Sequence, residues 1–361
     1  MARRIPALLA TGALLAVAAT PTLAANVNSQ NAYVVTNLQS DVPGLAQNTD
    51  SDLVNGWGIV AGPTTPWWVA DNGTSRSTLY NGATGAKVPT VIVDIAGRGG
   101  ARSGLPTGIV FNGVATDFVI TGSTGATSNA RFIFDSLDGT VSAWNGGPAS
   151  VITYTSDHDS VYTGLAIGTV GDDQFLYAAD FANGHVDVLD RTFTLQDWGD
   201  AFTDPNLPAD YAPFGIQVLN GEVYIAYALR GEDGDEVHGA GLGIVSAFGT
   251  DGSFDGRVAT GGPLNAPWGL AWAPAGWERF GDHLLVGNFG DGRINAYRAT
   301  GSGWEDRGHL KDANHHPLVI DGLWGIGFGN GAAGGPTTSL YFAAGPDDET
   351  HGLFGSITAA P

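Results

Sequence analysis

The stretch LYAADFANGHVDVLD, residues 176–190, decides the fold because it is one unit of a repeat. An apolar run ends at Asp180, a short polar turn follows, and the chain then alternates between apolar and polar residues. Alternation with a period of two, carried by β-branched and aromatic residues, predicts two strands joined by a tight turn. Recurrence of this unit along the chain would therefore fix the architecture.

The unit recurs six times, and a Gly-Ile or Gly-Leu step marks each copy. These steps begin at Gly58, Gly108, Gly164, Gly215, Gly269 and Gly325, at spacings of 50, 56, 51, 54 and 56 residues. A second apolar run follows each step, as in WWVADN, DFVITG and FLYAAD, and then a third, alternating run, as in STLYN, GTVSAW and GHVDVL. A fourth, more polar run precedes most of the next steps. Repeats of about 40–50 residues with several strands each are typical of propeller blades. The sequence therefore predicts an all-β, six-bladed propeller with four strands per blade.

The sixth repeat ends one strand short, at LFGSITAAP. A spare strand, NAYVVTNL at residues 31–38, lies near the other end of the chain. We predict that this strand completes the sixth blade, because that pairing closes the ring and removes an exposed sheet edge.

The first 24 residues have the composition of a secretory signal. Arg3 and Arg4 precede the apolar run IPALLATGALLAVAAT, and the small-residue sequence TLA ends at Ala24. We therefore expect residues 25–361 to form a single propeller domain that is secreted or periplasmic. No later run reaches the roughly 18 apolar residues of a membrane span, so none is expected.

Charge and cysteine content narrow the possible partners. The chain has no cysteine, which excludes disulfides and thiolate metal sites. It carries 15 basic and 36 acidic residues; without Arg3 and Arg4 the balance is 13 to 36. Such an acidic surface repels phosphate backbones, so nucleic acid is not expected as a partner. We expect a monomer whose partner is a small molecule, a glycan or a protein.

The repeat pattern resembles the NHL repeat of six-bladed propellers. Nearly the whole mature chain resembles a family of uncharacterised secreted bacterial propellers, some of which carry a C-terminal exosortase-sorting tail. The matching stretches include WWVADNGTSRSTLYNG, ARFIFDSLDGTVSAWN, LYAADFANGHVDVLD, FTDPNLPADYAPFGIQ and GPDDETHGLFG. This resemblance implies a propeller fold and export but no known reaction. The chain stops at Pro361 without such a tail, so surface anchoring is not expected.

The pattern Asp-Glu-x-His-Gly occurs twice, at residues 235–239 and 348–352. The two copies occupy equivalent turns of the predicted blades four and six, which would bring His238 and His351 to one rim. Imidazoles and carboxylates on converging loops can hold a divalent metal or share acid–base work. Arg230 could hold a substrate carboxylate there. Alternatively, each copy only satisfies its own turn, with glycine supplying a positive φ.

A second candidate set carries oxygen ligands. Asp71, Asp180 and Asn288 end predicted second strands, and Asn55 and Asp321 precede the innermost strands of blades one and six. Oxygen ligands near a propeller axis suit Ca²⁺, although side chains of this type also cap turns.

The residues directly before the six glycines argue against a lactonase-type calcium site. In lactonase-like propellers those positions tend to carry acidic or amide ligands. Here they are Trp57, Thr107, Thr163, Phe214, Trp268 and Trp324. The four aromatic residues could either stack on a ligand at the channel mouth or wedge between blades as core.

The remaining charged loop residues leave three functions open. His158 and His315-His316 are either solvated loop histidines or ligands. Arg98, Arg102 and Arg230 either hold a substrate carboxylate or form exposed salt bridges. The leading hypothesis is an exported propeller that binds its partner on the long-loop face. The second is a metal-dependent hydrolase or lyase, with His238 and His351 as ligands or base, and the metal either Ca²⁺ or a transition metal. The third is a scaffold without chemistry.

Overall fold

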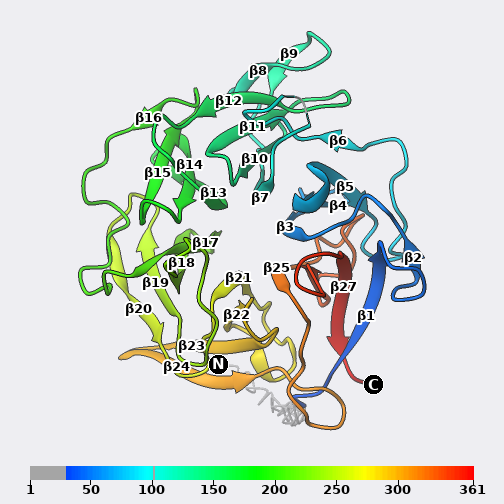
Figure 1. The fold of residues 1–361 in the computed structure, drawn as a ribbon. Helices are drawn as coiled ribbons and strands as arrows, with labels where there is room; N and C mark the ends of the chain where they lie inside the picture. The colour runs from blue at the N-terminus through cyan, green and yellow to red at the C-terminus, as the bar shows by residue number, and fades with distance from the viewer. Residues whose placement is uncertain (1–29, 101) are drawn as a thin grey trace, which may run out of the picture.

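Six small antiparallel sheets stand around one axis, as Figure 1 shows. The computed structural model describes residues 30–100 and 102–361; the predicted secretory signal at residues 1–24 lies outside the described residues. The predicted six-bladed propeller is confirmed. Two single-turn 3-10 helices, Asn72–Thr74 and Glu278–Phe280, are the only helices in the described part of the chain, and neither is long enough to cross a bilayer.

The blades follow one another in chain order, each from its innermost to its outermost strand. Blade 1 contains β3 (Gly56–Val60), β4 (Trp67–Asp71), β5 (Arg76–Tyr80) and β6 (Val93–Asp94). Blade 2 contains β7 (Pro106–Phe111), β10 (Phe132–Ser136), β11 (Thr140–Trp144) and β12 (Val151–Thr155). Blade 3 contains β13 (Tyr162–Val170), β14 (Asp173–Asp180), β15 (His185–Asp190) and β16 (Leu195–Gln196).

The second half of the ring repeats this arrangement. Blade 4 contains β17 (Tyr211–Leu219), β18 (Glu222–Leu229), β19 (Ile244–Gly249) and β20 (Phe254–Thr260). Blade 5 contains β21 (Pro267–Trp272), β22 (Leu284–Asn288), β23 (Ile294–Thr300) and β24 (Gly303–His309). Blade 6 contains β25 (Leu323–Phe328), β26 (Leu340–Ala344) and β27 (Leu353–Ala359), and it is completed from the other end of the chain.

The N-terminal strand β1 (Tyr33–Ser40) pairs antiparallel with β27, from Tyr33 opposite Ala359 to Ser40 opposite Leu353. The short β2 (Asn48–Thr49) then adds to β1 in parallel. The predicted closure of blade 6 by the N-terminal strand is therefore confirmed. Backbone hydrogen bonds between β1 and β27 therefore close the ring. The chain has no cysteine, so no disulfide can do this instead.

The assignment of DFVITG as the second strand of blade 2 is wrong. Part of it forms β8 (Val119–Thr121), which pairs only with β9 (Thr127–Asn129) in a separate hairpin. A second strand is covered by neighbouring blades on both faces, and all five residues of β10 are buried. Val119 and Thr121 are exposed, which suits a surface hairpin but not the middle of a blade.

The six repeat glycines lie where neighbouring innermost strands touch backbone to backbone. A Cβ at Gly215 would lie 2.1 Å from the carbonyl oxygen of Trp268, and one at Gly269 would lie 2.4 Å from that of Trp324. The same contact recurs around the ring and ends with Gly325, whose Cβ would lie 2.7 Å from the carbonyl oxygen of Trp57. Only glycine allows this approach, so the sequence marker of the repeat is also the closing contact of the ring.

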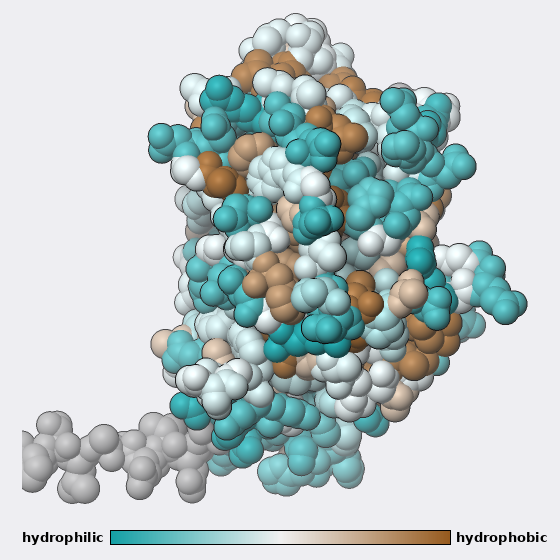
Figure 2. Space-filling model, turned by 90° about the vertical axis from the view of Figure 1, so that its left-hand side faces the viewer, coloured by the Kyte–Doolittle hydropathy of each residue, from teal (hydrophilic) through white to brown (hydrophobic). Residues whose placement is uncertain are grey.

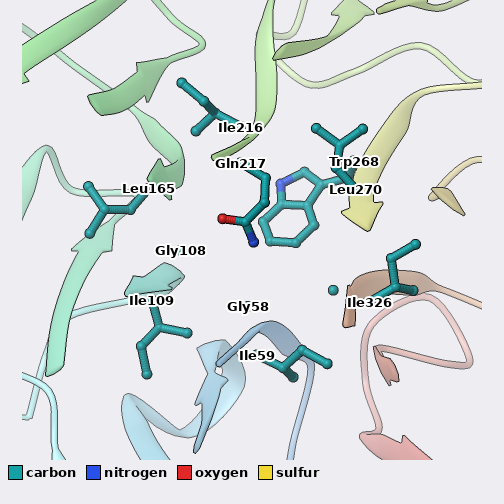
Figure 3. Close-up of a pocket in the computed structure, with 11 residues that line it drawn as sticks. Gly58, Ile59, Gly108, Ile109, Leu165, Ile216, Gln217, Trp268, Leu270 and Ile326 are labelled. Carbon is teal, nitrogen blue, oxygen red and sulfur yellow. The ribbon is translucent and has the colours of Figure 1, made fainter. Parts of the chain in front are cut away.

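The channel along the axis is filled rather than open. Figure 3 shows isoleucine and leucine side chains around it, with the amide of Gln217 pointing toward the centre beside Trp268. The remaining cavity is about 20 Å³, which is room for about one water molecule. A ligand larger than water must therefore bind on a face or between blades.

Candidate functional site: a rim over an aromatic plug

An aromatic plug closes the axis on the face that carries the long loops. Trp57 stacks on Trp324 with ring centres 3.5 Å apart, and Trp324 stacks on Phe289 at 3.9 Å. Trp268 and Phe214 pack edge-on or tilted against this stack. All five are buried. Of the two alternatives for these residues, the structure thus places them in the core, beneath the loop face rather than as an open collar.

Glu349 is directed toward the plug by an unusual turn. Asp347, Asp348 and Glu349 have φ values of 58°, 51° and 62°, so three consecutive residues other than glycine are left-handed. Such a conformation costs about 1–3 kcal/mol per residue and persists only where the surroundings enforce it. Asn55 donates from Nδ2 to Glu349 Oε2 at 2.6 Å, and its Oδ1 accepts from Trp324 Nε1 at 3.1 Å.

The other turn carrying the repeated pattern reaches the same plug from blade 4. The ring of His238 contacts Phe289 edge-on at 5.1 Å, and its Nε2 lies 3.2 Å from Glu236 Oε1. The hydrogen bond to Glu236 raises the pKa of His238, and the charge of Glu349 adds to this effect. Burial raises the pKa of Glu349, and the charges of Glu236 and Asp235 raise it further. We call Asn55, Glu236, His238 and Glu349 the axial rim; its members come from blades 1, 4 and 6.

The imidazole of His351 does not lie with this group, although its backbone carbonyl accepts from the amide of Asn55 at 3.0 Å. Its Nδ1 is 2.8 Å from Asp41 Oδ2, and the amide of Gly352 donates to Asp41 Oδ1 at 2.8 Å. Asp41 directly follows β1, so this half of the repeated pattern ties the blade 6 turn to the N-terminal strand. The structure therefore brings Glu349, rather than His351, toward His238. The sequence pattern contained Glu236 and Glu349, but only its histidines were named as the residues expected to meet at the rim.

Arg230 follows β18 and turns toward blade 3. Its Nη1 donates to the carbonyl oxygens of Phe181 at 3.3 Å and Ala182 at 2.5 Å. Its backbone forms a bridge with that of Glu236, so it belongs to the same loop as His238 while its guanidinium faces a different blade.

The candidate oxygen ligands make hydrogen bonds close to their own positions. Asp180 accepts from the amides of Val161 and Asn183, both at 3.2 Å. Asn288 donates to Pro263 at 2.8 Å and to Asp291 at 3.0 Å. The contacts with Asn183 and Asp291 cap turns, which is the alternative that the sequence left open, whereas those with Val161 and Pro263 reach a preceding loop. Asn288 Oδ1 is buried without a hydrogen-bond partner among the described residues.

Asp71 and Asp321 differ from those two. Asp71 is fully buried, neither of its oxygens has a hydrogen-bond partner among the described residues, and burial raises its pKa well above the ordinary value. Asp321 Oδ2 accepts from the amide of Asp347 at 3.0 Å and so supports the left-handed turn.

The other charged loop residues named from the sequence either hydrogen-bond to neighbouring loops or are exposed. Arg98 donates to the carbonyl oxygens of Asp138 and Ser156, and Arg102 to that of Thr74. His158, His315 and His316 are exposed, and His316 lies 3.6 Å from Asp312.

One group of three acidic or histidine side chains in the described part of the chain has ligand atoms within 4.8 Å of one another: Asp180, His185 and Asp187. His185 Nε2 lies 3.0 Å from Asp187 Oδ1, and Asp187 also accepts from the hydroxyl of Tyr162. Of these, the sequence singled out only Asp180. His185 Nε2 lies 3.9 Å from Asp180 Oδ2, while Asp180 accepts hydrogen bonds from Val161 and Asn183, so the polar atoms of the group are already engaged within the protein.

Asp135 is a fully buried carboxyl that sequence analysis missed. It lies in β10 of blade 2, next to the strand's end, and its Oδ1 accepts from Gly108 N at 2.6 Å and Thr107 Oγ1 at 2.8 Å. FIFD in the quoted stretch ARFIFDSLDGTVSAWN has the same form as LYAAD in blade 3, but assigning DFVITG to this strand hid it. Burial raises the pKa of Asp135 to about 6.

This carboxyl predicts a pH-dependent stability. Because its folded-state pKa exceeds the unfolded value near 4, the folded state binds the extra proton between about pH 4 and pH 6, and stability falls as pH rises through that window. The unfolding free energy of the wild type relative to Asp135→Asn should fall by about 3 kcal/mol between about pH 3.5 and pH 7. Urea titrations across this range test it; a constant difference would contradict it. Asparagine keeps the acceptor for Gly108 and Thr107, so it is a fair reference.

Two curated proteins of Acanthamoeba polyphaga mimivirus resemble this chain over most of both lengths. Uncharacterized protein R648 is 30% identical over 336 residues, covering 90% of this chain and 79% of the viral protein. Uncharacterized protein L690 is 32% identical over 326 residues, covering 87% and 82%. This chain belongs to their family. No family model matches it.

The family has relatives in a giant virus, so the bacterial family expected from the sequence is not supported. Solved structures share the fold of this chain at low sequence identity. A streptogramin B lyase matches with a TM-score of 0.50 at 13% identity, covering 91% of this chain and 98% of that one. The soluble aldose sugar dehydrogenase of Escherichia coli matches with a TM-score of 0.51 at 12% identity, covering 91% and 100%. At this identity the likeness shows the six-bladed fold alone.

Proposed function

We propose that this protein is an exported propeller that binds a small molecule on its long-loop face, at the axial rim. The observation that carries the proposal is the inward-directed carboxylate of Glu349. A left-handed turn of three non-glycine residues holds it against Asn55 of blade 1 and near His238 of blade 4. Backbone strain of this kind clusters at binding and catalytic sites.

The charges of the rim favour a cation among the possible ligands. The charges of Glu236 and Asp235 raise the pKa of Glu349, and the charge of His238 lowers it. Burial is the main cause of the raised pKa of Glu349 and carboxylate repulsion adds to it; a positively charged ligand offsets both effects by stabilising the ionised form. Its binding is expected to weaken as pH falls, because protons compete for the same carboxylate.

A metal-dependent hydrolase or lyase is the second candidate, favoured by the imidazole of His238 beside Glu236 and by the charge of Glu349 acting on it from blade 6. The ligand atoms of these three residues do not all lie within 4.8 Å of one another, so holding a metal requires them to move together. Glu236, His238 and Glu349 are of the types that hold a divalent transition metal, which would supply a polarised water or substrate oxygen. In this case His238 is a metal ligand rather than the base, and Arg230 takes no part, because its guanidinium faces blade 3. The lyase name of one fold neighbour is compatible with this candidate, but likeness at 13% identity does not carry it.

Two probes separate these candidates. Benzyltrimethylammonium and Mn²⁺ are titrated separately into the mature protein, by calorimetry and by tryptophan fluorescence, since Trp324 and Trp57 lie under the rim. Glu349→Gln keeps an acceptor for Asn55 but removes the charge, and should weaken binding of the organic cation at least about tenfold. Asp348→Asn, an exposed neighbour in the same turn, is the matched control and should leave binding unchanged.

Each outcome selects one function. Binding of the organic cation that depends on Glu349 supports the binding propeller. Binding of Mn²⁺ alone, lost in both Glu349→Gln and His238→Ala, supports the metal-dependent enzyme. If neither probe binds the wild type, the binding propeller and the metal-dependent enzyme are both refuted, and the scaffold without chemistry is the remaining hypothesis. Export rests on residues 1–24 and is tested by N-terminal sequencing of the protein recovered outside the cytoplasm.

A further inference from the structure

A pocket of about 280 Å³ lies between blades 3 and 4, away from the axial rim. Its walls come from the turn before β15, from the loop entering β17, and from the ends of β17 and β18. Figure 2 shows the side of the molecule to which these blades belong; hydrophobic residues form separate patches there among hydrophilic ones. Recognition of a ligand on this side therefore depends on a built pocket rather than on a broad apolar surface.

One wall of the pocket holds a buried hydroxyl without a partner. Tyr227 is 1% exposed, and its hydroxyl makes no hydrogen bond to any described residue. The nearby carboxylate of Asp204 does not serve it, because Arg257 donates to both Asp204 oxygens at 2.6 and 3.1 Å and Ser246 donates at 2.8 Å. A buried polar group left unbonded costs about 1–3 kcal/mol, so an acceptor entering the pocket would recover this energy.

The pocket also contains a guanidinium without a carboxylate. Arg230 uses Nη1 for two backbone carbonyls, while Nε and Nη2 donate to no described residue. No carboxylate of the described chain lies within 4.0 Å of it, although the protein has 36 acidic residues against 15 basic ones. The free Nε–Nη2 edge of an arginine matches the two oxygens of a carboxylate.

The rest of the pocket combines apolar and aromatic side chains with the polar side chains of Asn183, His185, Thr203 and Asp204, and the Asp204 carboxylate is already neutralised by Arg257. Phe202 is buried, Tyr211 and Leu207 are half-buried, and Pro208 and Ala209 cover the outer side. Flat apolar walls between an arginine and a phenol suit a compact ring.

We propose that this pocket binds a small aromatic monocarboxylate, with the carboxylate on Arg230, the ring against Phe202 and Tyr211, and a polar substituent accepting from the Tyr227 hydroxyl. This ligand class is distinct from the cation proposed at the axial rim. The pocket does not include Glu349, His238 or Asn55. Ligand binding in this pocket can therefore be tested independently of ligand binding at the axial rim.

The test is calorimetric titration of the mature protein with 4-hydroxybenzoate. Binding should weaken at least about tenfold in Arg230→Gln and about threefold to tenfold in Tyr227→Phe. The neutral isostere 4-hydroxybenzamide should bind the wild type at least about tenfold more weakly. Tyr227→Phe removes an atom that no fold contact uses, so it should fold even if Arg230→Gln does not.

Matched controls come from blade 5 and from the rim. Tyr297 also has a buried, unbonded hydroxyl, and Arg298 is exposed, so Tyr297→Phe and Arg298→Gln should bind as the wild type does. Glu349→Gln should also leave 4-hydroxybenzoate binding unchanged, which separates this site from the rim. The proposal is overturned if 4-hydroxybenzoate shows no saturable binding, if Tyr227→Phe binds as the wild type does, or if the benzamide binds as well as the benzoate.

Discussion

Trp324→Ala is expected to lower the free energy of unfolding by about 4 kcal/mol, the range for truncating a fully buried tryptophan. Trp324 is the middle ring of the plug, stacked on Trp57 on one side and on Phe289 on the other, and it is 0% exposed. Its removal leaves a cavity at the point where blades 1, 5 and 6 meet. It also leaves Asn55 Oδ1 without its donor.

Urea unfolding followed by circular dichroism measures this loss. Trp324→Phe keeps a ring in the stack but removes the hydrogen bond to Asn55, and should cost about 1–2 kcal/mol. Trp304 lies half-buried on the outer strand β24, so Trp304→Ala should cost clearly less than Trp324→Ala. A loss below about 1 kcal/mol for Trp324→Ala would show that the plug does not hold the ring together.

Gly215→Ala is expected to destabilise the protein by at least about 3 kcal/mol, at or above the usual range for overpacking. The new Cβ would lie 2.1 Å from the carbonyl oxygen of Trp268, a backbone atom of the next blade that cannot rotate away. Relief requires blades 4 and 5 to separate, and in a closed ring that strains the other interfaces as well.

Two further glycines extend this prediction to an order of stability losses. At Gly164 the corresponding Cβ would lie 3.2 Å from the carbonyl oxygen of Phe214, so Gly164→Ala should cost less than Gly215→Ala. At Gly301 no atom lies within 4 Å, and its φ is not left-handed, so Gly301→Ala should be neutral or slightly stabilising. Thermal and urea unfolding of the three variants should reproduce this order. Equal stability of the Gly215 and Gly301 variants would refute the role assigned to the repeat glycines.

Most of the fold is predictable from the sequence because each blade has its own alternating strand pattern and its own Gly-Ile or Gly-Leu step. Strand alternation depends on residues two apart, and the close backbone approach of neighbouring innermost strands, tightest at Gly215 and loosest at Gly164, favours glycine in every blade. Strand counting also predicts the closure by β1, since the last repeat is one strand short. The error in blade 2 arose because the hairpin β8–β9 carries alternating apolar residues too: Phe118 and Ile120 are buried beneath it, while Val119 is exposed.

The candidate site is less predictable, because its geometry depends on segments that are distant in the chain. The repeated Asp-Glu-x-His-Gly pattern predicts two equivalent turns, and both turns lie on the loop face. Their side chains nevertheless differ in direction. His238 meets Phe289 and Glu236 at the plug, whereas His351 meets Asp41, which is 310 residues away in sequence.

The sequence by itself determined the number of blades, the position of the innermost strands and the closing of the ring, because these follow from periodic contacts within strands and between adjacent ones. Only the tertiary structure decided which acidic and histidine side chains share a site, and that the Tyr227 hydroxyl, unbonded among the described residues, lines one pocket with the Arg230 guanidinium, which has no carboxylate partner there. A side chain's direction and its bonding are set by whichever groups the folded ring places beside it. Those neighbours come from other blades, and no local pattern encodes them.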